Sequence, residues 1–391
     1  MKKLRGTFLL LLFSGQIFSQ IPVSAGWWGK SVGKFTQLAY SEGYDRLGSA
    51  KMGYIDTGIL LNVVDSTAAL YEVRLSKNHT AFVQKADILR DSSLHPLASP
   101  LSSNWKVKGG KDKFDTLFVR LDEKLPYKSW MEINPSRILI DLYGVRSNTN
   151  WITQFTSLKE IKNTYFTQVE DDVEQLTIEL RHHQHWGYTI AYHGDILEVL
   201  VKRQPPVLQL QKLKIAIDAG HGGTNIGAQG VTTHIAEKEY TLLYAKALEK
   251  YLRANGVRNI VLTRRDDTTF GNTDRVVWLQ KQQPDLLVSL HFNSSDDSEV
   301  RGSSSYYKDI GFRQLSVSLL KEMLAAGMQE YGNVGNFNFL LNQPTDFPSA
   351  LLEIAFLSNQ ADEKKILSSK FRNQVARQVY LGLVDFLNKA K

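Results

Sequence analysis

The sequence predicts an α/β fold for its C-terminal part, with a mostly parallel sheet flanked by helices and preceded by two small all-β domains. Length is the first observation behind this prediction, since 391 residues suffice for two or three domains. The hydrophobic pattern is the second observation. Up to about residue 202 short apolar runs alternate with turn residues, whereas from Lys214 apolar strands alternate with long amphipathic helices. The third is the seam Arg203-Gln204-Pro205-Pro206, because paired prolines are excluded from helix interiors and central strands.

Composition excludes several classes of protein. Hydrophobic residues make up 42% and charged residues 22% of the chain, which are globular proportions and argue against wholesale disorder. The net charge is +7 and its excess lies mainly upstream of Lys214, without the concentrated basic stripe that nucleic-acid binding requires. The chain has no cysteine, which excludes disulfides, thiolate metal sites and cysteine nucleophiles.

Residues 1–25 predict a secretory signal peptide. A basic patch in the first five residues precedes the apolar run 7–13, which is too short to span a bilayer. Cleavage after Ser19 and cleavage after Ala25 both fit, and an uncleaved membrane-surface anchor is the alternative. We expect an exported protein, located in the periplasm or cell envelope, with no transmembrane span.

Residues 47–91 predict a small β-barrel, because short apolar strands at 59–64, 70–75 and 80–83 are separated by turn-forming residues. The run GILLNVVDSTAALYEVRLSKNHTAFVQKADI resembles a bacterial Src-homology-3-like domain. Such modules often bind cell-wall peptides, and a structural spacer is the alternative interpretation.

Residues 92–103 predict a linker, and residues 106–202 a second all-β domain. Strands are expected at 116–121, 137–142, 175–180, 187–191 and 196–201, and alternation places Leu176, Ile178 and Leu180 on one face. The run PSRILIDLYG and the later paired strands resemble an AMIN domain, a β-sandwich that localises envelope enzymes.

Three histidines of this domain, His182, His183 and His185, raise the question of a metal site. Only His183 and His185 would share a face of a strand, and a site normally needs three or four convergent ligands. We therefore interpret the segment as the end of a hairpin.

Polar residues that carry chemistry occur at or near the ends of three apolar strands in the C-terminal domain. Strand 214–218 leads to His221, strand 285–290 leads to His291, and Glu353 interrupts the apolar run 350–356. Ligand crevices of open α/β sheets lie at the carboxyl ends of the strands. A carboxylate inside an apolar strand is costly unless it is paired or bound, so Glu353 indicates a site.

Glu237 opens a helix that Gly256 is placed to stop, and its expected apolar face consists of Tyr240, Leu243, Tyr244, Ala247, Leu248 and Tyr251. Two histidines and one carboxylate form the ligand set of open catalytic zinc sites, in which water takes the fourth position. Amide hydrolysis then needs a second carboxylate for proton transfer. The alternative, non-functional interpretations are that His221 is a turn residue and that Glu237 is a charged residue at the N-terminus of a helix.

The sequence segments around these residues favour the zinc site over the alternatives of a turn histidine and a plain helix charge. DAGHGG, IAEKEYTL, DLLVSLHFNSS and PSALLEIAFLSNQADE occur in this order, and together they resemble the four signature segments of the zinc-dependent N-acetylmuramoyl-L-alanine amidases. The resemblance covers residues 214–391, the expected catalytic zinc amidase domain. It implies His221, Glu237 and His291 as ligands of one Zn²⁺ and Glu353 as the catalytic acid/base. Glu239 is the rival of Glu237 as a ligand, and Arg275 falls where the family carries a structural arginine.

The function that follows is that of an exported cell-wall hydrolase. It would cleave the amide between N-acetylmuramic acid and L-alanine of peptidoglycan stem peptides, and the N-terminal β domains would bind envelope partners. The alternatives are a non-catalytic or activator-dependent peptidoglycan-binding protein of the same fold, and a zinc hydrolase of another amide or ester.

The sequence departs from the family pattern in places that touch no expected ligand. Thr224-Asn225-Ile226-Gly227 stands where an acidic residue and a proline are usual, Gln280 replaces an asparagine, and Asn342 stands near a usual arginine after an expected strand at 337–341. Between Gly302 and Glu353 there is room for one amphipathic helix and one strand, but not for the long helical plug of some relatives. We therefore expect a constitutively open site.

Overall fold

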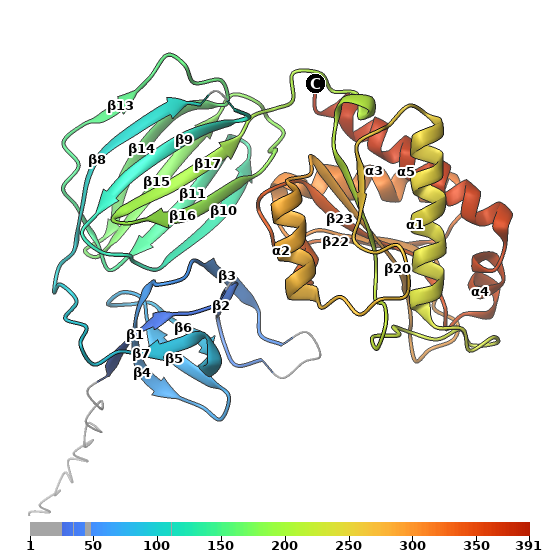
Figure 1. Ribbon diagram of the computed structural model, residues 1–391, viewed down its shortest axis with the longest axis horizontal. Helices are drawn as coiled ribbons and strands as arrows, with labels where there is room; N and C mark the ends of the chain where they lie inside the picture. The colour runs from blue at the N-terminus through green and yellow to red at the C-terminus, as the bar shows by residue number, and fades with distance from the viewer. Residues whose placement is uncertain (1–25, 34, 44–47, 111) are drawn as a thin grey trace, which may run out of the picture.

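The computed structural model describes residues 26–391 except 34, 44–47 and 111, so the predicted signal peptide lies outside the described residues. Three units follow one another along the chain, each built on its own sheet or pair of sheets (Figure 1). None of the helices in the described part of the chain has the length and apolar character needed to cross a membrane.

The first unit is a seven-stranded antiparallel sheet in the order β3-β2-β6-β5-β4-β1-β7. Its elements are β1 (Trp27–Ser31), β2 (Thr36–Ala39), β3 (Lys51–Ile55), β4 (Leu60–Ser66), β5 (Leu70–Arg74), β6 (Thr80–Gln84), the 3₁₀ turn η1 (Lys85–Asp87) and β7 (Ile88–Arg90). The three predicted strands correspond to β4, β5 and β6. The sheet also includes β1 and β2, which lie upstream of residue 47. A glycine interrupts β1: Gly29 lies so close to β7 that a Cβ there would be 2.8 Å from the Leu89 carbonyl oxygen.

The second unit consists of two sheets that lie face to face in Figure 1. One has the order β10-β11-β15-β14 and the other β12-β8-β9-β17-β16, with β13 paired to β8. The strands are β8 (Leu101–Gly109), β9 (Phe114–Leu121), β10 (Tyr127–Ile133), β11 (Ser136–Tyr143), β12 (Arg146–Ser147), β13 (Ile152–Gln154), β14 (Ile161–Glu170), β15 (Val173–Leu180), β16 (Tyr188–His193) and β17 (Ile196–Lys202). Leu176, Ile178 and Leu180 are buried in the shared core, as their alternation predicts. The linker is shorter than expected because β8 already begins at Leu101.

The histidine segment 182–185 is not the end of a hairpin, and this part of the sequence interpretation is wrong. It connects β15 of one sheet to β16 of the other. His182 Nδ1 lies 2.7 Å from Glu160 Oε2, and the buried His185 ring contacts the Glu132 carbonyl oxygen at 2.8 Å. These two histidines therefore contact different neighbours in the connection between the two sheets.

The third unit contains a six-stranded sheet in the order β19-β18-β20-β23-β21-β22, in which only the β21–β23 pair is antiparallel. Its strands are β18 (Ile215–Ala219), β19 (Ile260–Leu262), β20 (Leu286–Asn293), β21 (Ser303–Tyr306), β22 (Glu330–Val334) and β23 (Ser349–Phe356). Its helices are α1 (Glu237–Ala254), α2 (Asn272–Gln282), α3 (Arg313–Ala325), α4 (Gln360–Ile366) and α5 (Ser369–Lys389), with 3₁₀ turns η2 (Leu210–Lys212), η3 (Ile310–Phe312) and η4 (Leu340–Asn342).

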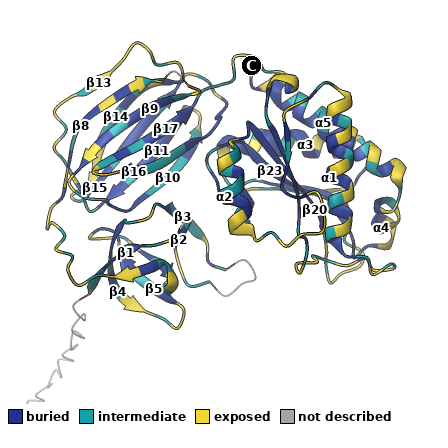
Figure 2. Cartoon of the chain, in the orientation of Figure 1, coloured by how far each residue is buried: buried dark blue, intermediate teal, exposed yellow. Residues whose placement is uncertain are grey.

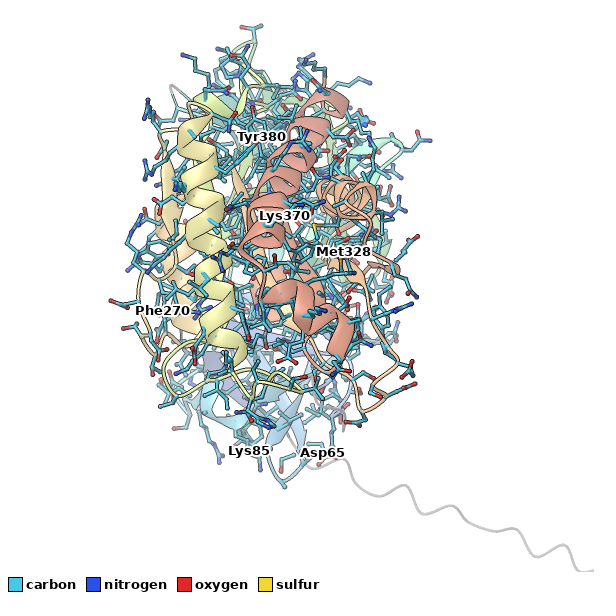
Figure 3. All side chains as sticks on the ribbon, turned by 90° about the vertical axis from the view of Figure 1, so that its right-hand side faces the viewer. Asp65, Lys85, Phe270, Met328, Lys370 and Tyr380 are labelled. Carbon is cyan, nitrogen blue, oxygen red and sulfur yellow. The ribbon has the colours of Figure 1, made fainter. Side chains whose placement is uncertain are left out.

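Helices cover both faces of this sheet, so its central strands are buried (Figure 2). In β18, Ile215 and Ile217 face the cluster that contains α1, α3 and α5, whereas Ala216 faces α2. Figure 3 views α1 and α5 side by side, and the Tyr251 and Tyr380 rings join them at 5.6 Å between centroids. The expected strands at 214–218, 285–290 and 350–356 are confirmed within a few residues.

Two local predictions for this unit are wrong. Leu243 is 46% exposed, because the core stripe of α1 runs through Tyr240, Tyr244 and Leu248 with Ala245 and Leu252. The strand expected at 337–341 is an irregular segment that ends in η4, and the strand lies earlier, at β22. Gly335 and Asn336, which has a φ of 52°, turn the chain out of β22 before the aromatic residues begin.

Candidate metal centre and catalytic site

Three residues from distant parts of the third unit bring their donor atoms together. One ligand atom from each of His221, Glu237 and His291 lies within 4.8 Å of the others. His221 Nε2 is 3.0 Å from Glu237 Oε2, and His291 Nδ1 is 3.0 Å from Glu237 Oε1. Glu237 therefore bridges the two imidazoles. The exposed Glu239 lies outside this group.

His221 occupies a strained turn just after β18. Its φ of 60° is left-handed, a conformation that costs a non-glycine residue about 1–3 kcal/mol. The guanidinium of the buried Arg275 donates to the His221 carbonyl at 2.9 Å and to the Ala219 carbonyl at 3.2 Å. Arg264 donates to the Ala219 and Gly220 carbonyls at 2.9 and 3.0 Å. Two cations thus hold the turn that presents the His221 ring.

Asp218 anchors this arrangement beneath the turn. It is fully buried and accepts hydrogen bonds from Ser289 Oγ at 2.5 Å, Thr263 Oγ1 at 2.7 Å and Arg275 Nη1 at 3.0 Å. Burial opposes its ionisation, but the guanidinium of Arg275 and the surrounding donors hold the pKa of Asp218 below its usual value. The ion pair therefore stays charged inside the core.

Glu237 is the first residue of α1, where the helix dipole favours a carboxylate. Its side chain accepts hydrogen bonds from the backbone N–H groups of Ala228 and Phe292, both at 2.9 Å. Burial opposes its ionisation, but hydrogen bonds with His221 and His291 lower the pKa of Glu237 well below its usual value. Burial disfavours protonated His221, but contact with Glu237 raises the pKa of that imidazole overall.

Close packing around the three donors depends on glycines and one amide. A Cβ on Gly220 would overlap the His291 ring, and one on Gly227 would overlap the Glu237 carboxylate. Asn225 Oδ1 lies 2.8 Å from His221 Nδ1, which leaves Nε2 to face Glu237. The segment GHGGTNIGA therefore provides the donor His221 and also the glycines and the asparagine that allow close packing around it.

Glu353 lies beside the cluster on the neighbouring strand. It pairs with His291 in the parallel register of β20 and β23, so the two side chains emerge on the same face of the sheet. Glu353 is half-buried and stands outside the group of three donors. Burial raises the pKa of the nearby Tyr306 hydroxyl, and the charge of Glu353 adds to this rise. The register thus places Glu353 beside the donors.

Aromatic residues that the sequence interpretation missed form one wall of the site. Phe339 meets the His291 ring edge-on at 5.4 Å, Phe337 stacks on Phe339 at 6.4 Å, and Tyr306 lies 4.5 Å from Phe337. The alternation of Phe337 and Phe339 was a usable signal, but it suggested a strand. The roles of Arg264 and Asn225 had no local signal, because their partners lie on other segments.

The donor set fits a zinc ion. Two imidazole nitrogens and one carboxylate oxygen are the ligands of open catalytic zinc sites, in which the fourth position takes water or substrate. Gly220 and Gly227 keep the space around these donors free of side chains. The anchored second nitrogen of His221 is the arrangement expected of a metal-binding histidine.

Known proteins with similar sequences are cell-wall amidases. The family model described as N-acetylmuramoyl-L-alanine amidase matches residues 215–385. The chain is 33% identical over 178 residues to N-acetylmuramoyl-L-alanine amidase LytC of Bacillus subtilis, a match that covers 44% of this chain and 35% of LytC. It is 30% identical over 211 residues to the probable cell wall amidase LytH of Staphylococcus saprophyticus, which covers 52% of this chain and 68% of LytH.

Two solved structures resemble the third unit. The catalytic domain of the N-acetylmuramoyl-L-alanine amidase CwlV from Bacillus (Paenibacillus) polymyxa var. colistinus matches with a TM-score of 0.43 and 32% identity, covering 45% of this chain and 98% of that one. The N-acetylmuramoyl-L-alanine amidase from Clostridium difficile 630 matches with a TM-score of 0.44 and 27% identity, covering 45% and 97%.

Proposed function

The chain belongs to the N-acetylmuramoyl-L-alanine amidase family, and from this premise we propose that it is a zinc-dependent hydrolase of peptidoglycan. The bond cleaved is the amide between the lactyl group of N-acetylmuramic acid and the L-alanine of the stem peptide. The observation that carries the proposal is the convergence of His221, Glu237 and His291 beside Glu353.

In this proposal His221, Glu237 and His291 would hold one Zn²⁺. A bound zinc ion polarises a carbonyl and lowers the pKa of its water to about 7. Asn225 and the backbone donors to Glu237 orient these ligands before any metal arrives.

Glu353 acts as the general acid/base. It accepts a proton from the attacking water as the new C–O bond forms on the lactyl carbonyl. It returns the proton to the L-alanine nitrogen as the C–N bond breaks, which yields a lactyl carboxylate and a peptide with a free amine. Its place on β23 keeps this carboxylate next to the donors without making it one of them.

The upstream parts of the chain are proposed to bring the enzyme to the cell wall. Residues 1–25 serve as the export signal, and the protein works in the periplasm or cell envelope. The first and second units serve as the Src-homology-3-like and AMIN-like modules, which bind peptidoglycan or envelope partners.

The site is proposed to be constitutively open. Between β21 and β23 the chain forms only η3, α3, β22, η4 and their connections. α3, β22 and η4 pack into the third unit, and η3 contacts β10 of the second unit. Strong stimulation of the purified enzyme by an envelope activator would contradict this point.

The proposal is tested on purified peptidoglycan, with soluble products read by mass spectrometry for peptides that start with a free L-alanine amine. Release that stops on chelation and returns with zinc supports the proposal. A folded, zinc-loaded protein that releases nothing would instead be an activator-dependent or non-catalytic relative. Cleavage of small generic amides or esters in preference to peptidoglycan would indicate a hydrolase of another class.

A further inference from the structure

Three lysines, one from each unit, line one pocket where the units meet. Lys51 comes from β3, Lys128 from β10, and Lys308 from the segment between β21 and η3. This lysine pocket has a volume of about 390 Å³, and its other walls include Tyr40, Trp130 and the amides of Asn336 and Asn338. Because it needs all three units, the pocket exists only in the assembled chain.

Within the described residues, the lysines of the pocket form no salt bridge, and Asp309 is the carboxyl group in its wall. Among the residues that the structure describes, none of the three lysines has a carboxylate oxygen within 4.0 Å. Lys51 Nζ donates to the Asn338 carbonyl at 3.1 Å, and Lys308 Nζ donates to Asn336 Oδ1 at 2.7 Å and Asn338 Oδ1 at 3.0 Å. Burial lowers the pKa of Lys51, and the charge of Lys308 lowers it further. Positive charges that lie close together in a partly buried pocket repel one another, and a bound anion stabilises them.

The third lysine adds aromatic surface to this cationic pocket. Lys128 Nζ lies over the Trp130 ring at 5.0 Å and over the Tyr40 ring at 5.6 Å. Such walls suit an organic anion with apolar groups better than a bare inorganic ion.

A second cavity of about 250 Å³ adjoins the lysine pocket and is acidic. The two share Met52, Ser129, Lys308 and Asp309 in their walls, and Asp56, Asp309 and Asp346 line the second cavity. Within the described residues, Tyr54 Oη, Asp309 Oδ2 and Gln343 Nε2 are buried polar atoms without a hydrogen-bond partner. Gln343 is only 6% exposed. Unpaired buried polar atoms indicate that this cavity receives the polar groups of a ligand.

We propose that the two cavities form one binding site for a short peptide that carries both a free amine and carboxylates. The amine enters the acidic cavity and the carboxylates enter the lysine pocket. This inference rests on the proposed function, because a stem peptide acquires the free α-amine of its L-alanine when the amide to the glycan is cleaved. The site thus recognises the peptide product and distinguishes it from the glycan-linked substrate.

The test measures binding of a synthetic stem tripeptide, L-Ala-γ-D-Glu-L-Lys, to the zinc-loaded full chain by isothermal titration calorimetry. Two matched probes are the same peptide N-acetylated at alanine and the same peptide with its carboxylates converted to amides. Each change is expected to weaken binding by about tenfold or more. Chelation of the metal should leave binding of the unmodified peptide unchanged, which separates this site from the metal centre.

Variants locate the site. Lys51→Gln, Lys128→Gln and Lys308→Gln should each weaken binding of the unmodified peptide and reduce the preference for it over the amidated probe. Lys85→Gln and Lys106→Gln are matched controls from the first two units, because these lysines also lie over aromatic rings, those of Tyr71 and Phe155, but outside the pocket. If a pocket variant fails to fold, the wild-type chain still gives a test, since high ionic strength should weaken binding of the unmodified peptide more than binding of the amidated probe.

Several outcomes would overturn the inference. They are equal binding of all three peptides, insensitivity to the lysine variants, and displacement by inorganic phosphate at the concentration of the peptide. Hydrolysis of peptidoglycan together with any of these would leave the proposed function intact and remove only the peptide site. Selective peptide binding without hydrolysis would do the reverse.

Discussion

The candidate metal centre and the three-unit junction treat buried charge in opposite ways. At the metal centre the carboxylates of Asp218 and Glu237 each meet several donors within the third unit, and Arg275 meets Asp218 and three carbonyls. At the junction Lys51, Lys128 and Lys308 come from three units and form no salt bridge among the described residues, and Asp309 Oδ2 has no hydrogen-bond partner there. The difference teaches that the first region is preorganised by one fold, whereas the second is completed by what it binds.

Loss of the metal should have the largest effect. His291→Ala and His221→Ala each remove one of three donors, so we expect zinc content to fall below stoichiometry and peptide release to disappear. Zinc is measured by atomic absorption after dialysis and release by mass spectrometry. His193→Ala is the matched control, because His193 is exposed on β16 and far from the donors in sequence. Full zinc content in both donor variants would show that the cluster is not the metal site.

Removal of the proton-transfer group should come next. Glu353→Gln keeps the shape of the side chain but cannot carry the proton, so turnover should fall by about 10²–10⁴-fold. Zinc should remain bound, because Glu353 is not a donor. Glu330→Gln, at an exposed position of β22 in the same sheet, is the control. A wild-type rate for Glu353→Gln would mean that another residue acts as the base.

A smaller effect is expected from loss of the hydrogen bond that orients the ligand His221. Asn225→Ala removes the acceptor that orients His221, which should weaken zinc binding by about 10–100-fold. Asn225→Asp should restore the affinity, since a carboxylate accepts the same hydrogen bond. Competition with a chromogenic chelator measures the affinity, and Thr224→Ala, at the exposed neighbouring residue, is the control. Unchanged affinity in Asn225→Ala would show that the centre is not preorganised by this contact.

The smallest effect tests the junction through its response to pH. Burial raises the pKa of Asp309 to about 7, against an ordinary value near 4. Between these values the folded chain keeps a proton that the unfolded chain releases, so the free energy of unfolding contributed by Asp309 falls as pH rises from about 4 to 7.

Scanning calorimetry of wild-type and Asp309→Asn proteins checks this expectation. The variant should gain on the wild type by about 2–4 °C in Tm between pH 5 and pH 8, because an asparagine has no proton to lose. A Tm difference that does not change with pH would show that Asp309 is ionised at no cost in the folded chain.

The sequence predicts most residues of the candidate metal centre because its signals are local. Each of the strands β18, β20 and β23 is an apolar run, and the polar residue at or near its end stands out against that run. Parallel pairing then brings His221, His291 and Glu353 to one edge without further information.

The rest depends on long-range packing that no local pattern records. Lys51, Lys128 and Lys308 are scattered over three units, and nothing in their neighbours marks them as a group. Phe337 and Phe339 alternate like strand residues, but the turn at Asn336 releases them to cover His291. The prediction for the histidine segment 182–185 failed for a similar reason, because its partners are distant in sequence: Glu160 directly precedes β14 and Glu132 lies in β10.

The short segment from Asn336 to Phe339 belongs to both regions at once. Asn336 and Asn338 bind the lysines of the first and third units, and one residue later the Phe339 ring lies against His291. Any coupling of the two sites through this segment would be equal in both directions, since linked equilibria are reciprocal. A chain that senses its own product at the junction would thereby carry feedback on the pace of wall turnover, written into four consecutive residues.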